Sequence, residues 1–376
     1  MAVVCPSKLS AQTGELNLER TNDPSKVIPI SLTGYSGTVQ EVLKFDLEVA
    51  GFELVGADAA KFFLSGGTGG QVQGRLAGAN KVAIFSKIYN GGSTRSQAHA
   101  LANDVIFAIT QTKGIAQSLI AFRVGEGKSS EICVADYDGA NLSAVTRDSS
   151  LVSVPCWMPG TRNLYYVSYK SGFPAILAHD LSSGVRKKIA GYGGSNFSPS
   201  VSPDGRHLAM ILSKTGNAEL FVSDINGENL KQLTHTREPE SSPCWSPDNR
   251  TICYVSTTSG RARLYKIGVD GGSSKALSTA GVGGNLTEPD WSPDGKTIVF
   301  TSQMSGFNIC TVPAEGGSVS ILVEGEDPAW AANSRTVIFT RRKTGGRGLS
   351  LLDVPTKHVK DVPRISGSAS QACWAK

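Results

Sequence analysis

Catalytic motifs are the first features to look for, and this chain has few candidates. None of its five histidines lies in an HExxH or comparable ligand spacing. Each is interpreted as a surface or helix-face residue: His99, His179, His207, His235 and His358. There is no GxSxG nucleophile elbow. GEGKSS from Gly125 resembles the end of a phosphate-binding loop, but Phe122 stands where that motif needs glycine. The sequence therefore predicts no catalytic residue, no metal site and no cofactor, and indicates a protein that is not an enzyme.

The remaining candidates are acidic residues that come shortly before a repeated tryptophan position. They are Glu238, Glu240, Glu288, Glu324, Glu326 and Asp327. The whole chain carries a net charge of +5 on 376 residues. A group of acids on a mildly basic protein could receive a basic partner or a cation. The alternative interpretation is ordinary solvated loop charge, and the residues alone leave both open.

The elements that would position these acids form a repeat. CWSPDNRTICYV begins at Cys244 and DWSPDGKTIVFT begins at Asp290, and weaker copies keep the same spacing. The anchor positions are Trp157, Val201, Trp245, Trp291, Trp330 and Trp374. A period of about 40–45 residues built from short strands is typical of a β-propeller with WD40-like repeats. The loops before the anchors should then surround one mouth of the propeller channel.

Six anchors predict six blades, and the last blade needs both ends of the repeat region. Trp374 has only one strand around it, and the missing strands lie at 118–124, 130–136 and 142–146. A blade assembled from both ends closes the ring without an exposed sheet edge. The tryptophans are expected to pack between neighbouring blades.

Two residue types that invite a chemical role are interpreted as structural. Asp204, Asp248 and Asp294 follow proline in SPDG or SPDN turns, where an Asp side chain bonds its own backbone. Seven cysteines are few and scattered, and none makes a CxxC motif. Cys156, Cys244 and Cys373 share one repeat position and are predicted to be small buried residues rather than disulfide or metal ligands.

The chain before the repeats has a different pattern. Strands are predicted at 27–32, at 52–55 and within 80–89, and helices over 38–50 and 93–114, with GGTGG at 66–70 as a flexible loop. Residues 1–14 are interpreted as a tail or the remnant of a signal, residues 15–114 as a small α/β domain, and residues 115–376 as the propeller. The predicted fold class is therefore α+β with two domains.

Several of these segments together resemble the TolB family, the periplasmic component of the Tol–Pal system of Gram-negative bacteria. The resemblance rests on the WSPDG repeats, VADYDGAN, SKTGNAELFVSD, HALANDVIFAITQTKGI before the propeller, and a final tryptophan. It covers about residues 16–376. It implies a non-enzymatic scaffold for outer-membrane integrity and constriction at cell division. MAVVC is too short to supply the apolar core of a secretion signal, so the periplasmic location follows from the resemblance alone.

The resemblance also implies two protein partners. A Pal-like peptidoglycan-associated lipoprotein would bind the propeller mouth near Glu238, Glu240, Glu288, Glu326 and Asp327. A TolA-like protein would bind the segment 16–27, with Leu16, Leu18, Arg20 and Asp23 as its site residues. We expect a monomer that is not inserted in a membrane and binds no nucleic acid, since no basic run exceeds RRK at 341–343. The alternatives are a ligand-sensing propeller and a propeller-based sugar lyase.

Overall fold

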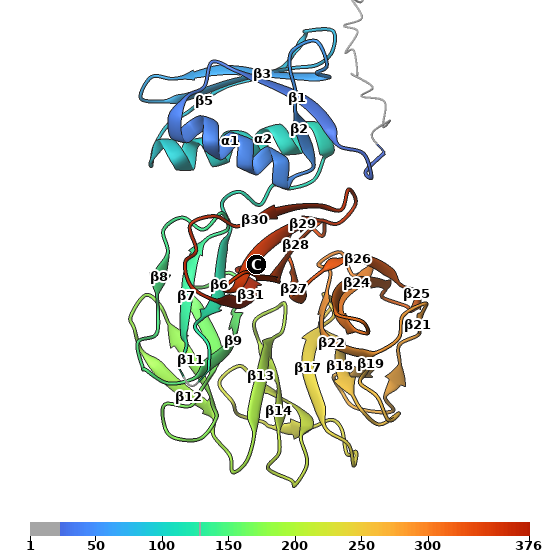
Figure 1. The fold of residues 1–376 in the computed structure, drawn as a ribbon. Helices are drawn as coiled ribbons and strands as arrows, with labels where there is room; N and C mark the ends of the chain where they lie inside the picture. Colours follow the sequence, from blue (N-terminus) through green and yellow to red (C-terminus); the bar gives the residue numbers. More distant parts are fainter. Residues whose placement is uncertain (1–22, 128) are drawn as a thin grey trace, which may run out of the picture.

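The structure is a computed structural model that describes residues 23–127 and 129–376. A small N-terminal α/β domain stands on a six-bladed β-propeller (Figure 1). The predicted fold class is confirmed. No helix in the described part of the chain is both long and apolar enough to cross a membrane.

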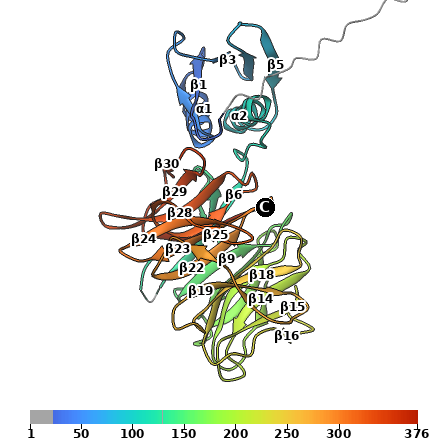
Figure 2. The ribbon, with the colours of Figure 1, turned by 90° about the vertical axis from the view of Figure 1, so that its right-hand side faces the viewer.

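The N-terminal domain is a five-stranded sheet with two helices on one face. Its strands are β1 (Ile28–Thr33), β2 (Phe52–Leu54), β3 (Phe62–Thr68), β4 (Val72–Ala77) and β5 (Ala83–Tyr89), in the order β2-β1-β3-β4-β5. The first three strands are parallel, whereas β3, β4 and β5 pair antiparallel. The helices α1 (Gly37–Val49) and α2 (Thr94–Thr110) lie between the sheet and the propeller (Figures 1 and 2).

The helix ends follow local chemistry. Ser93 caps α2 by accepting a hydrogen bond from the Ser96 N–H, with an N···O distance of 3.1 Å. The helix ends four residues before the predicted stop at Gly114, because Gln111 adopts the left-handed conformation with φ 57°. Gly51 ends α1 with φ +84°, as the sequence predicts.

The prediction that the glycine-rich stretch 66–70 forms a flexible loop is wrong. Its first residues belong to β3, which pairs with β4 in a hairpin. A Cβ on Gly66 would lie 1.8 Å from the carbonyl oxygen of Gln73 and 2.4 Å from the Tyr35 hydroxyl. Glycine is therefore needed here for close approach of the hairpin backbone.

Each blade of the propeller is a four-stranded antiparallel sheet. Blade 1 contains β9 (Val152–Trp157), β10 (Asn163–Ser168), β11 (Ala175–Asp180) and β12 (Arg186–Ala190). Blade 2 contains β13 (Asn196–Val201), β14 (His207–Leu212), β15 (Glu219–Asp224) and β16 (Lys231–Gln232). Blade 3 contains β17 (Glu240–Trp245), β18 (Thr251–Ser256), β19 (Arg263–Gly268) and β20 (Lys275–Ala276). Blade 4 contains β22 (Asn285–Trp291), β23 (Thr297–Gln303), β24 (Phe307–Pro313) and β26 (Ser320–Glu324). Blade 5 contains β27 (Glu326–Trp330), β28 (Thr336–Lys343), β29 (Gly346–Asp353) and β30 (His358–Asp361). A short parallel pair, β21 (Thr279–Ala280) with β25 (Gly317–Ser318), flanks blade 4.

Blade 6 confirms the predicted closure of the ring. Its innermost strand is β31 (Ala369–Trp374), and its other strands are β6 (Leu119–Val124), β7 (Glu131–Asp136) and β8 (Ser143–Ala144). Trp374 pairs with Ile120, so the two ends of the repeat region meet in one sheet.

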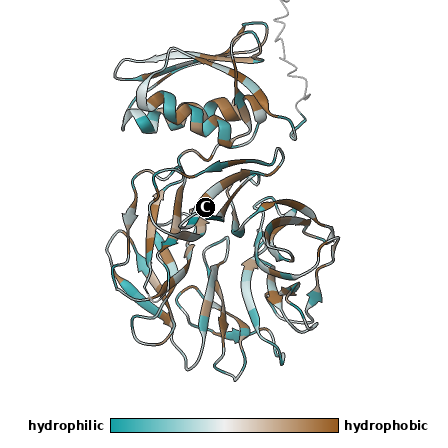
Figure 3. Ribbon diagram, in the orientation of Figure 1, coloured by the Kyte–Doolittle hydropathy of each residue, from teal (hydrophilic) through white to brown (hydrophobic). Residues whose placement is uncertain are grey.

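The repeated tryptophans pack between blades, as predicted. The five anchor tryptophans are between 2% and 8% exposed. Trp245 of blade 3 packs in a cluster with blade-2 residues such as Ile211 and donates from Nε1 to the Ser200 carbonyl at 2.8 Å. Hydrophobic residues are concentrated on the strands of the blades and on the two helices (Figure 3).

The turn aspartates, all five histidines and most of the cysteines lie in the described part of the chain. Asp248 accepts hydrogen bonds from the Ser246 hydroxyl and the Arg250 N–H, so it is a turn residue. The interpretation of the histidines is wrong for His179, which is buried on β11 at 5% exposed, whereas His99 is a residue of α2 and is buried at 4% exposed. Of the three cysteines at the shared position, Cys244 is buried, whereas Cys156 and Cys373 are half-buried.

Candidate functional site

The mouth of the propeller is formed where the six innermost strands begin. Counting back from each anchor, the fifth residue is buried in every blade: Val152, Asn196, Glu240, Leu286, Gly325 and Ala369. The third residue before the anchor has positive φ in every blade, between 49° and 54°: Val154, Ser198, Ser242, Glu288, Asp327 and Gln371. We call this second set the channel ring. The ladder shifts register there, so each strand carries a β-bulge.

The channel ring is unusual because none of its members is glycine. Left-handed backbone is uncommon for other residues and especially so for a β-branched one such as Val154. Five of the six positions are followed directly by proline: Pro155, Pro199, Pro243, Pro289 and Pro328. The strain recurs at one place in all six blades. Strained backbone of this kind concentrates at binding and active sites.

Hydrogen bonds connect four neighbouring members of the channel ring. The Asp327 N–H donates to Glu288 Oε2 at 2.9 Å, and the Gln371 N–H donates to Asp327 Oδ2 at 3.3 Å. The Val154 N–H then donates to Gln371 Oε1 at 3.1 Å. The side chains of Glu288, Asp327 and Gln371 therefore each bind the bulge of the next blade, which holds blades 4, 5, 6 and 1 together at the mouth.

The acidic part of the ring is partly neutralised. Burial raises the pKa of Asp327 well above its usual range, and the nearby carboxylates of Glu288 and Glu326 raise it further. Glu326 is buried and accepts a hydrogen bond from Arg347 Nε at 2.8 Å, with Arg342 Nη2 at 3.7 Å. The mouth thus carries both signs of charge rather than acids alone.

The five predicted mouth residues do not share one environment. Glu238 is exposed in the loop before β17, and Glu288 and Asp327 are half-buried in the channel ring. Glu240 and Glu326 are only 2% and 8% exposed, so neither presents a free charge to solvent. The sequence contained a signal that Glu240 is buried. The residues at the equivalent position of the other blades are all uncharged, as expected for a buried position.

Most of the predicted TolA-like site lies outside the described residues, as does the tail 1–14. This applies to Leu16, Leu18 and Arg20. Asp23 is described and exposed, and hydrogen bonds from the Ser25 hydroxyl and N–H lower its pKa.

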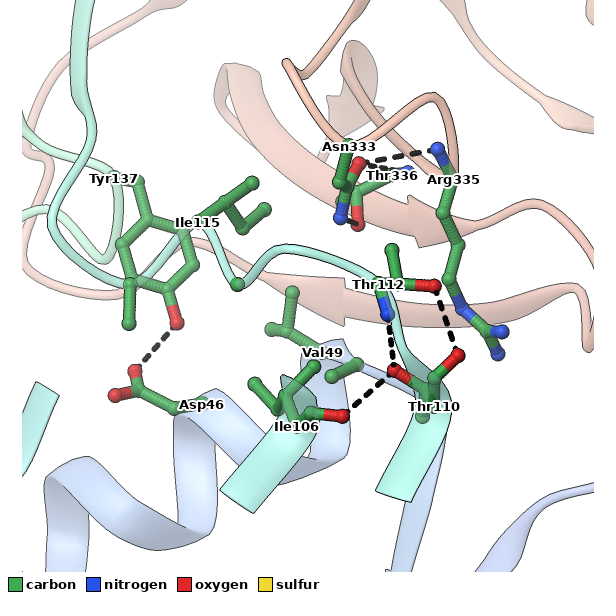
Figure 4. A pocket seen from close by; sticks show the side chains of 13 residues that line it. Asp46, Val49, Ile106, Thr110, Thr112, Ile115, Tyr137, Asn333, Arg335 and Thr336 are labelled. Atoms are coloured by element: carbon green, nitrogen blue, oxygen red, sulfur yellow. Dashed lines mark hydrogen bonds between the residues drawn. The ribbon is translucent and has the colours of Figure 1, made fainter. Parts of the chain in front are cut away.

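A second polar site, which the sequence did not predict, lies between the two domains (Figure 4). Asp46 on α1 is buried and accepts a hydrogen bond from the Tyr137 hydroxyl at 2.5 Å, from the turn after β7. His99 on α2 places Nδ1 2.7 Å from the other Asp46 oxygen. Burial raises the pKa of Asp46, and it raises the pKa of Tyr137 as well. One carboxyl thus joins both helices to blade 6.

Arginine side chains extend this interface on either side. Arg335, in the β27–β28 turn, makes a two-point ion pair with Asp353 at 2.5 and 2.9 Å. A Cβ on Gly51 would lie 2.5 Å from Arg335 Nη2, so glycine lets the end of α1 rest on this pair. Arg95 of α2 is ion-paired with Asp138 of the propeller. These contacts involve turns at the opposite end of the strands from the mouth.

The interface has an open groove of about 330 Å³ between α1 and the propeller residues Asp138, Lys360 and Arg364, and it encloses a much smaller cavity. It is lined by Asp46, Val49, Ile106, Ile115, Tyr137 and Arg335, among others, and its volume of about 10 Å³ is that of a single water (Figure 4). Within residues 23–127 and 129–376, no group of three or more His, Cys, Asp or Glu side chains is placed to hold a metal ion.

The family model of the TolB beta propeller domain matches residues 107–376 of the chain. The chain is 40% identical over 119 residues to a "Protein TolB homolog" of Chlamydia caviae, covering 30% of this chain and 28% of that protein. It is 35% identical over 134 residues to the "Tol-Pal system protein TolB" of Mannheimia succiniciproducens, covering 35% and 30%. The aligned part of this chain therefore spans less than a third of the length of these curated relatives.

Solved structures extend the likeness to the whole architecture. The crystal structure of TolB from Acinetobacter baumannii matches with a TM-score of 0.84 at 21% identity, covering 94% of this chain and 98% of that one. A putative TolB from Agrobacterium tumefaciens matches with a TM-score of 0.55 at 19% identity, covering 68% and 90%. At this identity the likeness concerns the fold.

Proposed function

This chain belongs to the TolB β-propeller family, and on that premise we propose that it is a non-enzymatic, periplasmic scaffold of the Tol–Pal envelope system. In this role it binds a Pal-like peptidoglycan-associated lipoprotein at the propeller mouth and a TolA-like protein through the segment 16–27. Linking these partners supports outer-membrane integrity and constriction at cell division. The printed name of a relative, "Tol-Pal system protein TolB", supports the assignment to this system.

The channel ring is the observation that carries the mouth assignment. Six blades each place a strained, non-glycine residue at the same depth, and four of them are joined by hydrogen bonds between blades. A partner seated on the mouth would contact loops from all six blades at once. Such a partner needs both acidic and basic surface, because Glu238 is exposed while Arg342 shows 57% of its side chain beside Glu326.

Surface plasmon resonance with a Pal-like domain tests this at two salt concentrations. Glu238→Lys should slow association at low salt and change its salt dependence, because exposed charge steers encounter more than it stabilises the complex. Exposed charge pairs contribute only about 0–1 kcal/mol each, so dissociation should change little. Glu240 is unsuitable for charge reversal because it is buried.

Glu315→Lys is the matched control. Glu315 shows 91% of its side chain and follows β24, at the end of the strands opposite the mouth. It should leave association unchanged. If both variants behave alike, or if the Pal-like domain does not bind at all, the mouth assignment is wrong.

The N-terminal partner requires a separate experiment. Deleting residues 16–27 should abolish capture of a TolA-like domain while the propeller keeps its unfolding transition. Asp23→Ala within the intact chain is a milder variant, since Asp23 is exposed and bonds only Ser25 among the described residues. Equal capture by the deletion variant and the intact chain would contradict a role for this segment.

A further inference from the structure

Two buried glutamates lie side by side where the loop before β17 enters the propeller. Glu219 begins β15 and is 3% exposed, and Glu240 begins β17 and is 2% exposed. The Glu240 N–H donates to the carbonyl of Ala218 at 2.8 Å, and Ala218 directly precedes Glu219. This backbone bond places the two glutamates side by side, between blades 2 and 3.

One loop residue, Thr236, contacts both carboxyl groups. Its N–H donates to Glu219 Oε1 at 2.7 Å, and its hydroxyl lies 2.9 Å from Glu240 Oε1. The same hydroxyl lies 2.7 Å from the carbonyl oxygen of Glu238. The Ser256 hydroxyl also donates to Glu240 Oε1, at 3.2 Å. The loop 233–239 is thus attached to the propeller through the two glutamates at Thr236, and through the Leu220 backbone at Leu233 and Thr234.

The second oxygen of each carboxyl group has no partner. Glu219 Oε2 and Glu240 Oε2 are both buried and make no hydrogen bond among the described residues. In the same part of the chain, neither glutamate is ion-paired with a lysine, arginine or histidine. The titratable side chains that act electrostatically on or with Glu240 are Glu219 and Tyr254. Ionising a buried carboxyl group such as Glu240, which has an acidic neighbour and no cationic partner among the described residues, carries a large cost.

We propose that the buried Glu240 carboxyl is protonated while the loop 233–239 is closed at the propeller mouth, and that this proton keeps the loop closed. The proton removes a negative charge from a carboxyl group whose Oε2 has no partner among the described residues. Loss of the proton leaves a buried carboxylate beside Glu219 with no cationic partner in the described structure, and opening of the loop at Thr236 lets water reach it. This latch is a property of the fold and does not depend on which partner binds the mouth.

The direction of the pH effect follows from Glu240. Burial raises the pKa of Glu240 from 4.5 to about 7, and the neighbouring Glu219 adds to the rise. The closed state therefore keeps its proton at pH values where the opened or unfolded state has released it. Closure is strongest at acidic pH and weakens as the pH rises from 4.5 to about 7. Over this range the opening equilibrium grows up to about tenfold per pH unit, and above it stays constant.

Blade 6 contains the same arrangement without the second acid. Glu131 begins β7 as Glu219 begins β15, accepts a hydrogen bond from the Thr146 hydroxyl, and lies 3.3 Å from the Ser149 N–H. The residue that corresponds to Glu240 there is Val152. Glu131 therefore anchors a loop with no like-charged neighbour in that position, and it provides a control within the same chain.

Hydrogen exchange of the full chain tests the latch, with intrinsic exchange rates corrected for pH. In the wild type, protection of the segment 233–239 should fall about tenfold between pH 5.5 and 6.5. In Glu240→Gln, protection should be the same at both pH values, since the amide carries no titrating proton. Glu131→Gln should leave the pH dependence of this segment as in the wild type.

A direct readout is the infrared carbonyl band of a protonated carboxyl. The spectrum of the wild type minus that of Glu240→Gln at pH 6 should contain this band, because Asp46 and Asp327, whose pKa values burial also raises, contribute equally to both spectra. Glu240→Leu is a second variant should Glu240→Gln fail to fold, and it should also remove the pH dependence of the loop. Wild-type protection that is equal at pH 5.5 and 6.5 would overturn the proposal. A pH dependence that persists in both Glu240 variants would do the same.

Discussion

At the scale of single residues, the Tyr137 hydroxyl is a buried hydrogen-bond donor that joins the two domains. It satisfies one oxygen of the buried Asp46 carboxyl. Tyr137→Phe leaves that oxygen without its donor, which should lower the free energy of unfolding by about 1–3 kcal/mol. Urea unfolding measures this.

Tyr166→Phe is the matched control for Tyr137→Phe. Tyr166 is also fully buried, but its hydroxyl has no hydrogen-bond partner among the described residues. Removing an unsatisfied hydroxyl should be neutral or stabilising. Equal losses in the two variants would mean that the Tyr137 hydroxyl contributes nothing specific.

Gly51 is a second position where one atom decides the domain contact. Gly51→Ala puts a Cβ 2.5 Å from Arg335 Nη2 at a backbone φ of +84°. The substitution should lower the free energy of unfolding by more than about 1–2 kcal/mol, the usual penalty for a left-handed residue with a side chain. Gly37→Ala has φ +54° and nothing within 4 Å. Thermal unfolding should therefore show a clearly larger loss for Gly51→Ala, and a smaller loss would contradict the close contact.

At the scale of elements, the tryptophans that separate the blades differ in their hydrogen bonds. Trp245 Nε1 donates to Ser200, whereas Trp157 Nε1 is buried with no partner in the described structure. Both are 5–6% exposed. Trp245→Phe should therefore lower the free energy of unfolding by about 1 kcal/mol more than Trp157→Phe does, since only the first substitution breaks a hydrogen bond. Chemical denaturation of both variants measures the difference, and a reversed order would refute the assignment.

Elements with strong periodicity were predictable from the sequence. The tryptophan spacing gave six blades and the split last blade, because a fixed repeat must close on itself to bury its edges. The β3–β4 hairpin was missed because its glycines indicate a loop, although they serve close approach of the backbone. The contact of α1 and α2 with the propeller was also missed, because nothing local marks Asp46 and Tyr137 as partners.

The site was less predictable than the fold. The channel ring has Val, Ser, Ser, Glu, Asp and Gln at its six positions, and none of these types except Asp favours a left-handed backbone. The proline that follows in five blades was visible but does not specify that conformation. Glu240 was placed on the rim by its charge and its place shortly before the Trp245 anchor, whereas its repeat position is buried in every blade.

At the scale of the whole molecule, stability depends on β31. This strand supplies the innermost strand of blade 6 and the buried Trp374, which donates to the Ala329 carbonyl at 3.0 Å. Deleting residues 369–376 should lower the unfolding free energy of the propeller by at least the ~3–5 kcal/mol usual for losing a buried tryptophan. A truncated protein that melts at the same temperature as the full chain would contradict this closure.

The same strand sets the order of events during synthesis. β6, β7 and β8 are made early, but their innermost partner follows roughly 250 residues later. Until the intervening blades and β31 are available, the chain keeps one apolar sheet edge of β6 unpaired. Joining it to β31 is a long-range, late and slow step. The unclosed ring is therefore the form most exposed to strand exchange and aggregation, and the one that a chaperone would have to shield.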